Sequence, residues 1–457
     1  MDSQTIVAPM TPAGVSAVAA LRVSGSRVRD VVRALFGERA AADLEPRRAA
    51  LGTARSTLKE GDAEECRGEV IDQLLYLYFA GPNSYTGEDV LELYPHGNPL
   101  IVRELMQAIR RVPGVRLAEP GEFTRRAYLN GKMDLSQAES VADVIHSANR
   151  AELKNAHRLL SGALSKKVKL LTEQIKDISA RLELDVDFAE EEADPDYAGW
   201  EGKLAAIRGN VEGILKSFRS KASVSRIPLA VLYGAPNAGK SSLVNALLGE
   251  DRILVSSVPG TTRDFVEVRL FLAGGEIRLV DTAGIAATAT DALDALSMQK
   301  SREVLEEADL KICVVDGSLP AADAEQEFNP DLVVLSKQDL VGGLPNAEGI
   351  SLAAPSIAVS AKTGYGLEEL SKEMNARLFK ATENTEDLWI TSEREKACLE
   401  EALKGIDRAL DLIRTSPAVE LLAFEMQLVR RSLQSITGEI SSEDILQSIF
   451  AGFCIGK

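Results

Sequence analysis

A phosphate-binding pattern lies near the middle of the chain. Residues Gly234–Ser241 read GAPNAGKS, with two glycines separated by four residues and followed by Lys240 and a serine. In a P-loop, backbone N–H groups surround a β-phosphate, the lysine reaches the β and γ oxygens, and the serine hydroxyl binds Mg²⁺. The apolar run Ile227–Tyr233 predicts a strand before the loop, and the amphipathic Ser242–Leu248 predicts a helix after it, which places phosphate at a helix N-terminus. An ordinary strand-turn-helix can share this pattern, so its meaning depends on further motifs.

Two segments downstream could complete a metal site. The loop GTTRD offers Thr262 to the metal, as a switch loop would. The segment DTAG follows the predicted strand Glu276–Val280, so that Asp281 can hold the Mg²⁺ shell while the Gly284 amide faces the γ-phosphate. Both segments follow the P-loop in the order that a nucleotide hydrolase requires.

Two later segments predict base recognition. Ser336–Asp339 follows the predicted strand Leu332–Leu335, and Ser360–Lys362 follows Ile357–Val359. The Asp339 carboxylate can accept from both N1–H and the 2-amino group of guanine, a pair of donors that adenine lacks. Each motif alone is weak, but their succession at strand ends predicts a guanine-nucleotide-binding domain with GTP as the nucleotide.

One residue departs from the usual guanine motif. Ser336 occupies the position where Asn normally ties this loop to the P-loop. A shorter hydroxyl would tie the loop less firmly, so we expect weaker nucleotide retention. Base choice should be unchanged because Asp339 remains.

Composition restricts the class of protein. The chain has 457 residues, enough for roughly two to four domains, and its 45% apolar residues predict a folded, soluble protein. No apolar run is long enough to span a bilayer, and the first residues lack the pattern of a signal peptide. The four scattered cysteines fit a reducing cytoplasm, and the three histidines offer no metal cluster.

The net charge of −17 argues against a broad, sequence-independent grip on nucleic acid, which needs an electropositive surface. Local basic clusters could still touch RNA, although a solvated helix face explains each of them more simply. These clusters are Arg125 with Arg126, Lys166 and Lys167 with Lys169, and Arg430 with Arg431.

The sequence pattern changes along the chain and divides it into parts. Residues 1–120 alternate short apolar runs with Gly/Pro turns and predict a small α/β domain. Helical patterns occupy 121–221 and 381–457, on either side of the nucleotide-binding domain at 222–380. In the first part the expected strands are Thr5–Ala8, Val15–Val23, Gln73–Phe79 and Val90–Tyr94, and the expected helices are Val28–Leu35 and Leu100–Arg111.

The two helical parts carry buried stripes. Apolar residues recur at helical spacing from Leu164 to Leu182 and again from Ile406 to Ile436, and the first stripe closes in the acidic run 190–192. Each stripe needs a partner, so we expect the helices before and after the nucleotide-binding domain to pack as one bundle with that domain inserted between them. The fold class is therefore multidomain α/β plus α.

The usual water-orienting residue is replaced. Ile285 fills the place after DTAG where many GTPases have Gln, and no arginine finger is identifiable. Another group must then stabilise charge between the β- and γ-phosphates. Asn237 offers a side-chain carbonyl suited to K⁺, and the oxygens of Ser256–Thr261 could complete a cage. Asn is also a common turn former, so the residue alone leaves the K⁺ site open.

Several longer segments are more specific than these motifs: Gln4–Ala8, Leu21–Gly25, Pro82–Glu92, Pro120–Leu135 and the tail Phe453–Lys457. Through them and the GTPase motifs, the chain resembles the bacterial and mitochondrial tRNA modification GTPase family (MnmE/TrmE) over essentially its whole length. The resemblance implies an N-terminal α/β domain that binds tetrahydrofolate and dimerises, a discontinuous helical bundle, and an inserted Ras-like P-loop GTPase domain.

The resemblance also implies the activity and its partners. A K⁺-activated GTPase of this family, with a flavin-dependent partner (MnmG/GidA), adds an aminomethyl or carboxymethylaminomethyl group at C5 of the wobble uridine (U34) of certain tRNAs. A 5,10-methylene- or 5-formyl-tetrahydrofolate would supply the one-carbon unit. The protein would be a cytoplasmic homodimer that forms a heterotetramer with its partner and does not contact a membrane.

The resemblance also implies which residues bind the folate, the metal ions and GTP. The folate positions would be Arg22, Glu92, Lys132 and Lys457, where Glu92 could accept from the pterin edge as Asp339 does from guanine. The Mg²⁺ ligands would be Ser241 and Thr262, and the K⁺ ligands Asn237, Ser256, Val258 and Thr261. The residues expected at GTP are Asn237, Ala238, Gly239, Lys240, Ser241, Ser242, Ser256, Ser257, Val258, Pro259, Gly260, Thr261, Thr262, Asp281, Thr282, Ala283, Gly284, Ser336, Lys337, Gln338, Asp339, Ser360, Ala361 and Lys362.

Two residues are candidates for catalysis. Asp294 is the nearest counterpart of the family's catalytic Glu, one methylene shorter and displaced by a one-residue gap, and a solvated switch residue is its alternative reading. Cys454 matches a family cysteine important for modification, and its alternative is a buried small hydrophobe.

Three functions therefore remain open. The first is a GTP hydrolase that forms half of a tRNA-modifying complex. The second is a GTP-dependent assembly or signalling switch without its own modification chemistry, and the third is a folate-dependent one-carbon transferase with an accessory GTPase. The folate segment and the Cys-Ile-Gly-Lys tail favour the first, since an assembly factor needs neither.

Overall fold

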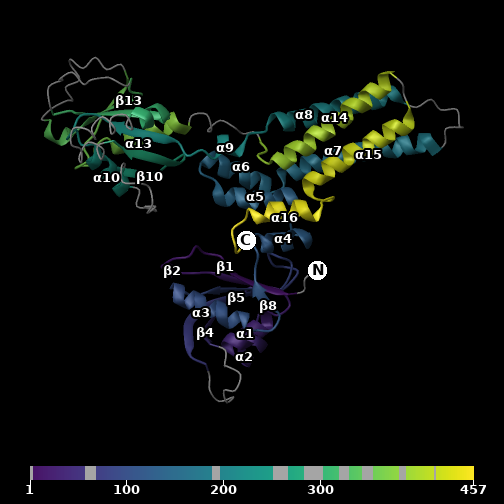
Figure 1. Ribbon diagram of the computed structural model, residues 1–457, viewed down its shortest axis with the longest axis horizontal. Helices are drawn as coiled ribbons and strands as arrows, with labels where there is room; N and C mark the ends of the chain where they lie inside the picture. Colours follow the sequence, from purple (N-terminus) through teal and green to yellow (C-terminus); the bar gives the residue numbers. More distant parts are fainter. Residues whose placement is uncertain are drawn as a thin grey trace. The chain divides into compact units, whose positions relative to one another are not determined.

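The computed structural model describes residues 4–56, 68–187, 196–250, 266–282, 302–318, 329–341, 354–379, 388–415 and 418–457. They form two compact units, and Figure 1 shows the elements of each. Unit 1 contains Met1–Ala142, Arg158–Phe218 and Ser392–Lys457, and unit 2 contains Asp143–His157 and Arg219–Thr391. Among the residues described, no helix combines the length and apolar character needed to cross a bilayer.

A six-stranded sheet forms the N-terminal part of unit 1, in the order β4-β5-β6-β3-β1-β8. β1 and β8 run parallel, and the other neighbours run antiparallel. Two helices bury their apolar stripes against one face, with Leu35 of α1 and Ile109 of α3 in the shared core. The bounds are β1 Thr5–Pro9, β3 Leu21–Ser24, β4 Ala49–Arg55, β5 Val70–Phe79, β6 Val90–Tyr94, β8 Val115–Leu117, α1 Val28–Phe36, α2 Glu38–Ala42 and α3 Pro99–Arg110.

The opposite face of this sheet is partly apolar and open. Leu51 and Leu75 are directly paired across β4 and β5, and 64% and 48% of them are exposed. Tyr94 pairs with Leu75 in the next strand, so its side chain lies on the same face. This face therefore joins exposed apolar residues to a polar cluster described below.

The single strand expected over Val15–Val23 is wrong. The segment forms two strands in different sheets, β2 (Ser16–Val18), which pairs with β7 (His96–Gly97), and β3. Ala19 and Ala20 separate them, and their backbone groups bond to Pro95 and Met10 instead of continuing one ladder. The alternation of apolar residues does not reveal this break because both halves keep the same composition.

The helical part of unit 1 is one bundle. α15 packs against both α7 and α14, and α14 packs against α8, as the apolar spacing predicted (Figure 1). The acidic run 190–192 lies outside the described residues. The bounds are α4 Glu122–Leu129, α7 Ala163–Asp187, α8 Tyr197–Lys216, α14 Glu393–Thr415, α15 Val419–Thr437 and α16 Glu443–Ala451, with α5 Leu135–His146 and α6 Arg150–Leu160 each shared between the units.

A second six-stranded sheet forms the centre of unit 2, in the order β10-β11-β9-β12-β13-β14. β10 is antiparallel to β11, and the remaining pairs are parallel. β9 and β13 are buried along their whole length, as expected of parallel strands covered on both faces. The bounds are α9 Lys221–Val224, β9 Leu229–Tyr233, α10 Lys240–Glu250, β10 Val266–Leu272, β11 Gly275–Asp281, β12 Leu310–Asp316, β13 Leu332–Ser336, η1 Gln338–Leu340, β14 Ser356–Ala358 and α13 Leu367–Phe379.

The link between α5 and α6 belongs to unit 2. Asn149 forms an antiparallel bridge with Gly275, and the Glu276 amide donates to the Ala148 carbonyl at 2.9 Å. Gly275 has φ of +153°, and a Cβ there would lie 2.7 Å from the Ala148 oxygen. Position 275 therefore requires glycine, and the link extends the β10–β11 hairpin.

Candidate functional site

The predicted nucleotide residues gather at one edge of the second sheet. β9, β11, β12, β13 and β14 are parallel, so their carboxyl ends meet at the same edge. The P-loop follows β9, Asp281 ends β11, Asp316 ends β12 and Ser336 ends β13. Ligands of open α/β sheets bind at this edge.

The P-loop has the backbone that a phosphate turn requires. Gly234 has φ of +137°, and a Cβ there would lie 2.2 Å from the Val314 carbonyl oxygen, so only glycine fits. Asn237 is left-handed with φ of 62°, and Gly239 has φ of +94°. α10 begins at Lys240 directly after the loop and so aims its free N–H groups at the loop.

Lys240 is held inside this turn. Its Nζ donates to the carbonyl oxygens of Gly234 at 2.9 Å and Ala235 at 2.8 Å, and the residue is 4% exposed. Burial lowers the pKa of Lys240, and the nearby Asp281 carboxylate opposes this effect. A cation with little solvent at this position is suited to phosphate oxygens.

Ser241, one of the two predicted Mg²⁺ ligands, lies beside Asp281, its expected outer-shell partner. Ser241 Oγ donates to Asp281 Oδ2 at 2.6 Å, and Asp281 is buried. Thr282 follows and donates its hydroxyl to the Leu232 carbonyl at 3.0 Å, which fastens the end of β11 to β9. Across the described ranges, no three His, Cys, Asp or Glu side chains form a metal-ligand group.

The residues predicted to recognise guanine surround a cavity of about 200 Å³. Asp339 Oδ1 accepts a hydrogen bond from Ser360 Oγ at 2.8 Å, which orients the carboxylate that would read the base. Residues from the P-loop, α10 and both base-recognition segments line it: Gly239, Ser242, Leu243, Ser336, Lys337, Asp339, Leu340, Val359, Ala361 and Lys362.

Ser336 connects this cavity to the P-loop. Its hydroxyl lies 2.5 Å from the Ala238 carbonyl oxygen and 3.1 Å from that of Val315. A hydroxyl carries one hydrogen and can donate to one acceptor at a time, whereas an Asn amide carries two. Serine therefore makes the tie, with the two carbonyls competing for its single proton.

Asp316 is a site residue that the sequence reasoning missed. Its Oδ2 lies 2.6 Å from Lys337 Nζ, and its Oδ1 accepts from the Ser318 hydroxyl at 2.6 Å. Burial alone would raise the pKa of Asp316, but the bonds from Lys337 and Ser318 outweigh it and lower the pKa. The ion pair fixes Lys337 beside the base cavity. The sequence feature that could have revealed Asp316 is the Asp-Gly pair at the end of the apolar run that forms β12.

Some predicted residues lie outside the described residues. These are the K⁺ and switch positions Ser256, Ser257, Val258, Pro259, Gly260, Thr261 and Thr262, the positions Ala283 and Gly284, and the catalytic candidate Asp294.

A polar cluster on the same face of the first sheet as Leu51 and Leu75 contains two predicted folate residues, whose side chains are only 11% and 12% exposed. Arg22 and Glu92 are directly paired across β3 and β6, with Arg22 Nη2 and Glu92 Oε1 2.9 Å apart. Tyr94 donates its hydroxyl to Glu92 Oε2 at 2.5 Å. The Arg22 guanidinium lies 4.7 Å from the Tyr85 ring centroid and 5.7 Å from that of Phe123. Tyr85, Tyr94 and Phe123 were not predicted.

The remaining folate candidates approach this cluster from other segments. Burial lowers the pKa of Lys457, and the charge of Arg22 lowers it further, while Glu92 and Cys454 oppose this. The tail is fixed because Gly456 has φ of +100° and a Cβ there would lie 2.3 Å from the Pro9 oxygen. Lys132 Nζ donates to the Pro82 carbonyl at 2.9 Å and thereby holds the loop that carries Tyr85.

Cys454 is exposed near the end of the same tail. The alternative reading of a buried hydrophobe is therefore wrong for this residue.

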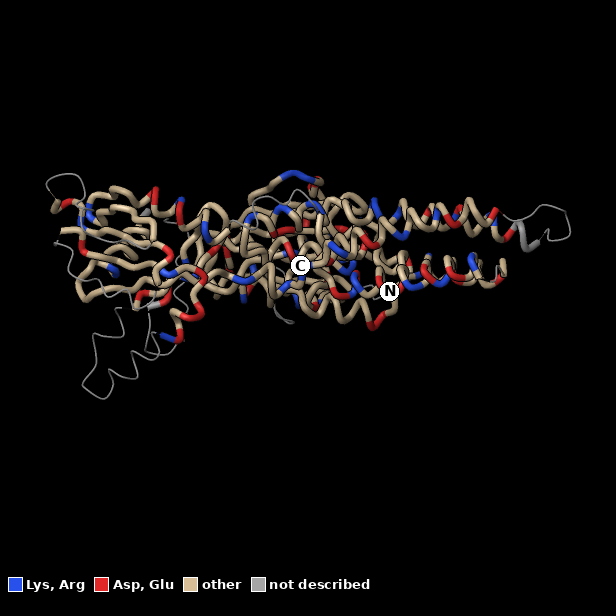
Figure 2. Tube along the Cα trace, turned by 90° about the horizontal axis from the view of Figure 1, so that it is seen from above, with Lys and Arg blue, Asp and Glu red and all other residues tan. Residues whose placement is uncertain are grey.

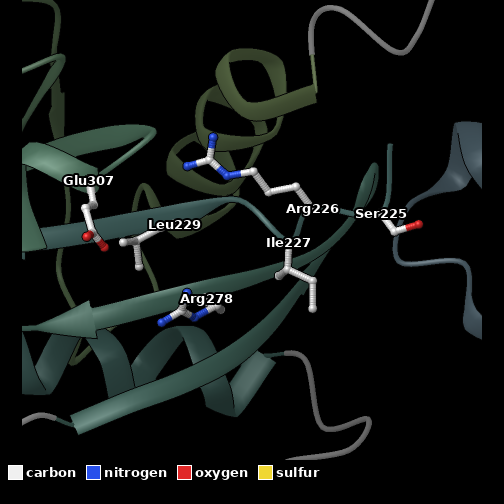
Figure 3. A pocket seen from close by; sticks show the side chains of 6 residues that line it. All are labelled: Ser225, Arg226, Ile227, Leu229, Arg278 and Glu307. Atoms are coloured by element: carbon white, nitrogen blue, oxygen red, sulfur yellow. The ribbon is translucent and has the colours of Figure 1, made fainter. Parts of the chain in front are cut away.

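A larger hollow of about 470 Å³ lies at the opposite end of β9 (Figure 3). Its two arginines already have acidic partners, since Arg226 lies 3.2 Å from Asp309 and Arg278 lies 2.8 Å from Glu267. No predicted site residue lines it. The lining residues are Ser225, Arg226, Ile227, Leu229, Arg278 and Glu307.

Comparison with known proteins finds family models and relatives that match nearly the whole chain. The family model described as the MnmE helical domain matches residues 135–454, and the model described as the GTP-binding protein TrmE N-terminus matches residues 5–132. Proteins called tRNA modification GTPase MnmE from Yersinia pseudotuberculosis and Yersinia pestis are 36% identical over 470 aligned positions, covering 100% of this chain and 99% of theirs.

Solved structures of GTP-binding proteins align with about a third of the chain. The G domain of the T. maritima FeoB iron transporter is 28% identical and covers 33% of this chain and 99% of its own, with a TM-score of 0.26. A nucleolar GTP-binding protein of Plasmodium falciparum is 18% identical and covers 34% of this chain and 88% of its own, also at 0.26. Scores this low do not bear on function.

Proposed function

Since the chain belongs to the MnmE family of tRNA modification GTPases, we propose that it couples GTP hydrolysis to modification of the wobble uridine of certain tRNAs. With a flavin-dependent partner (MnmG/GidA), it would add an aminomethyl or carboxymethylaminomethyl group at C5. One observation supports this proposal: a single chain contains a P-loop beside a cavity lined by the predicted guanine residues, and a separate cluster of Arg22, Glu92 and Lys457 whose chemistry fits a pterin.

The nucleotide half of the proposal depends on the second sheet. Lys240 and the N-terminus of α10 would bind the phosphates, and Ser241 with Thr262 would ligate Mg²⁺ while Asp281 holds the ion's outer shell. Asp339, oriented by Ser360, would read guanine. These residues bind and orient GTP, and they leave the stabilisation of transition-state charge to another group.

We infer that this group is K⁺. Asn237 lies in the P-loop turn with a left-handed backbone, and Ile285 occupies the place of a water-orienting Gln. A cation held by Asn237 together with Ser256, Val258 and Thr261 would supply positive charge between the β- and γ-phosphates. Asp294 would then act on the attacking water.

The part of the proposal that concerns one-carbon transfer depends on the cluster of Arg22 and Glu92 on the first sheet. Arg22 Nη1 is buried without a hydrogen-bond partner among the described residues, so the cluster fits an additional acceptor such as a folate carboxylate. Carboxylate oxygens accept more than one hydrogen bond, which leaves Glu92 able to receive the N–H donors of a pterin. Lys132 and Lys457 would neutralise further charge, and a 5,10-methylene- or 5-formyl-tetrahydrofolate would supply the carbon unit. Cys454, exposed on the adjoining tail, would contribute to modification.

The same face suggests a dimer. Leu51 and Leu75 are exposed on the side that carries Glu92 and Tyr94. Covering them with a second copy would remove apolar surface from water and enclose the folate cluster. A homodimer would then join two flavin-dependent partners in a heterotetramer, in the cytoplasm where tRNA is modified.

Nucleoside analysis tests this function. tRNA from a strain that lacks the gene should lack the C5 modification at wobble uridines, and plasmid-borne expression of the chain should restore it. Unchanged nucleosides in the deletion strain would contradict the proposal and favour the alternative, a GTP-dependent assembly or signalling switch.

A further inference from the structure

Two helix segments of the bundle carry cations and no acids. The first ten residues of α7, Ala163–Thr172, contain Lys166, Lys167 and Lys169, and the last part of α15, Met426–Thr437, contains Arg430 and Arg431; neither segment has an Asp or Glu. Each segment is therefore locally basic although the chain as a whole has a net charge of −17. The basic and acidic positions along the chain can be followed in Figure 2.

These two segments lie at the same end of the bundle. α7 and α15 pack against each other, and the residues just before α7 and just after α15 both lie beside the start of α5. Gln137 of α5 donates to the Leu160 carbonyl just before α7 at 2.9 Å. Gly438, which ends α15, accepts from the Tyr128 hydroxyl at 2.5 Å, and a Cβ there would lie 2.7 Å from Leu135. The start of α7 is therefore beside the end of α15.

The cations are exposed or unpaired. Lys166, Lys167, Lys169 and Arg431 are exposed, and no acidic side chain of the described residues forms an ion pair with them. Arg430 Nε is buried without a hydrogen-bond partner within those same residues. Elsewhere in the bundle, arginines such as Arg208 and Arg408 are paired with acids. This end of the bundle therefore has unused positive charge.

Helix stability does not explain the lysines of α7. The positive end of a helix dipole favours acids in the first turn and cations in the last. α7 has the reverse arrangement: its first half carries the lysines, and the acids Glu173, Asp177, Glu183, Asp185 and Asp187 follow in its second half. The helix dipole therefore gives no stabilising role to these lysines.

We propose that this basic end, defined by Lys166, Lys167, Lys169, Arg430 and Arg431, binds the phosphate backbone of tRNA. Unpaired cations spread over two neighbouring helices match a chain of phosphates. The inference rests on the proposed function, which supplies tRNA as the polyanion, and assigns its contact to the bundle. An overall acidic surface elsewhere would then orient the RNA by repulsion.

The test compares two charge-matched variants of the full chain. Lys166→Ala, Lys167→Ala and Lys169→Ala together remove the basic segment of α7. Lys176→Ala, Arg181→Ala and Lys203→Ala remove three exposed cations from the second half of α7 and from α8. Both change the net charge from −17 to −20, since three positive charges are lost. Binding of an unmodified tRNA transcript is measured by fluorescence anisotropy over a range of KCl concentrations.

The first variant should bind at least about tenfold more weakly at low salt, and the slope of log K against log salt should fall by about 2 to 3 units. The control variant should bind like the wild type, and both should keep normal GTP turnover. Equal tRNA binding by the two variants, or no tRNA binding by the wild type, would overturn the inference. Because binding is measured without modification, failure here is distinguishable from failure of the proposed function.

Discussion

At the scale of single residues, the base cavity shows how one substitution in a motif is accommodated. Ser336 ties the guanine loop to Ala238 of the P-loop but shares its only proton between two carbonyl groups. Asp339, which would choose the base, has its own support from Ser360. Retention of the nucleotide and choice of the base would therefore depend on different residues.

Ser336→Asn should slow the release of bound GDP. An amide can donate to Ala238 and Val315 at once, and one extra hydrogen bond contributes about 0.5–1.5 kcal/mol, which corresponds to a roughly twofold to tenfold slower rate. Stopped-flow release of a fluorescent GDP analogue measures it. Asp339→Asn is the contrasting variant, because it should exchange the preference for guanine for a preference for xanthine. A faster release from the Ser336→Asn protein would show that the tie does not limit retention.

At the scale of elements, α4 begins at a buried ionic cluster. Glu122 is 6% exposed and accepts from Arg116 at 2.7 Å and from Arg126 at 2.8 Å. It also accepts from the Glu119 amide at 2.9 Å, which closes the turn before the helix. Burial raises the pKa of Glu122, but the bonds from Arg116, the Glu119 amide and Arg126 outweigh this and lower the pKa below its ordinary value of 4.5.

Glu122→Gln should destabilise unit 1 by about 3 kcal/mol at neutral pH, because it leaves buried arginine charge without its partner. Since the folded-state pKa is lowered, this stability is fully present above about pH 4.5 and is lost as pH falls through the folded-state value. Urea unfolding of both proteins at several pH values checks this. A difference that stays constant down to strongly acidic pH would count against the ionic origin.

The sequence predicts elements better than it predicts how they are joined. The P-loop, its flanking strand and helix, and the apolar stripes of α7 and α15 follow from local spacing. Three features do not: the break at Ala19 and Ala20, the pairing of Asn149 with Gly275, and the ion pair of Asp316 with Lys337. Each depends on a residue distant in sequence, which no local pattern contains. The folate residues depended on the family resemblance, because Arg22 and Glu92 alone are ordinary strand residues.

At the scale of the whole molecule, the proposed K⁺ site would make GTP turnover depend on the alkali metal present. We expect turnover in KCl to exceed turnover in NaCl of equal ionic strength by at least about tenfold. A correctly placed positive charge that stabilises the transition state accelerates a reaction by this factor or more. Phosphate release is the measurement. Asn237→Ala should remove the difference while leaving GDP binding intact, and equal rates in the two salts for the wild type would rule out a K⁺ site.

The most direct test of the account asks whether the two sites of the chain act on one product. Cells in which Glu92→Gln replaces the wild type supply tRNA for mass spectrometry of wobble uridines, and the purified variant supplies GTP turnover rates. We expect the C5 modification to be lost while GTP hydrolysis is retained, because Glu92 lies only in the proposed one-carbon site. Normal modification in the Glu92→Gln cells would contradict it.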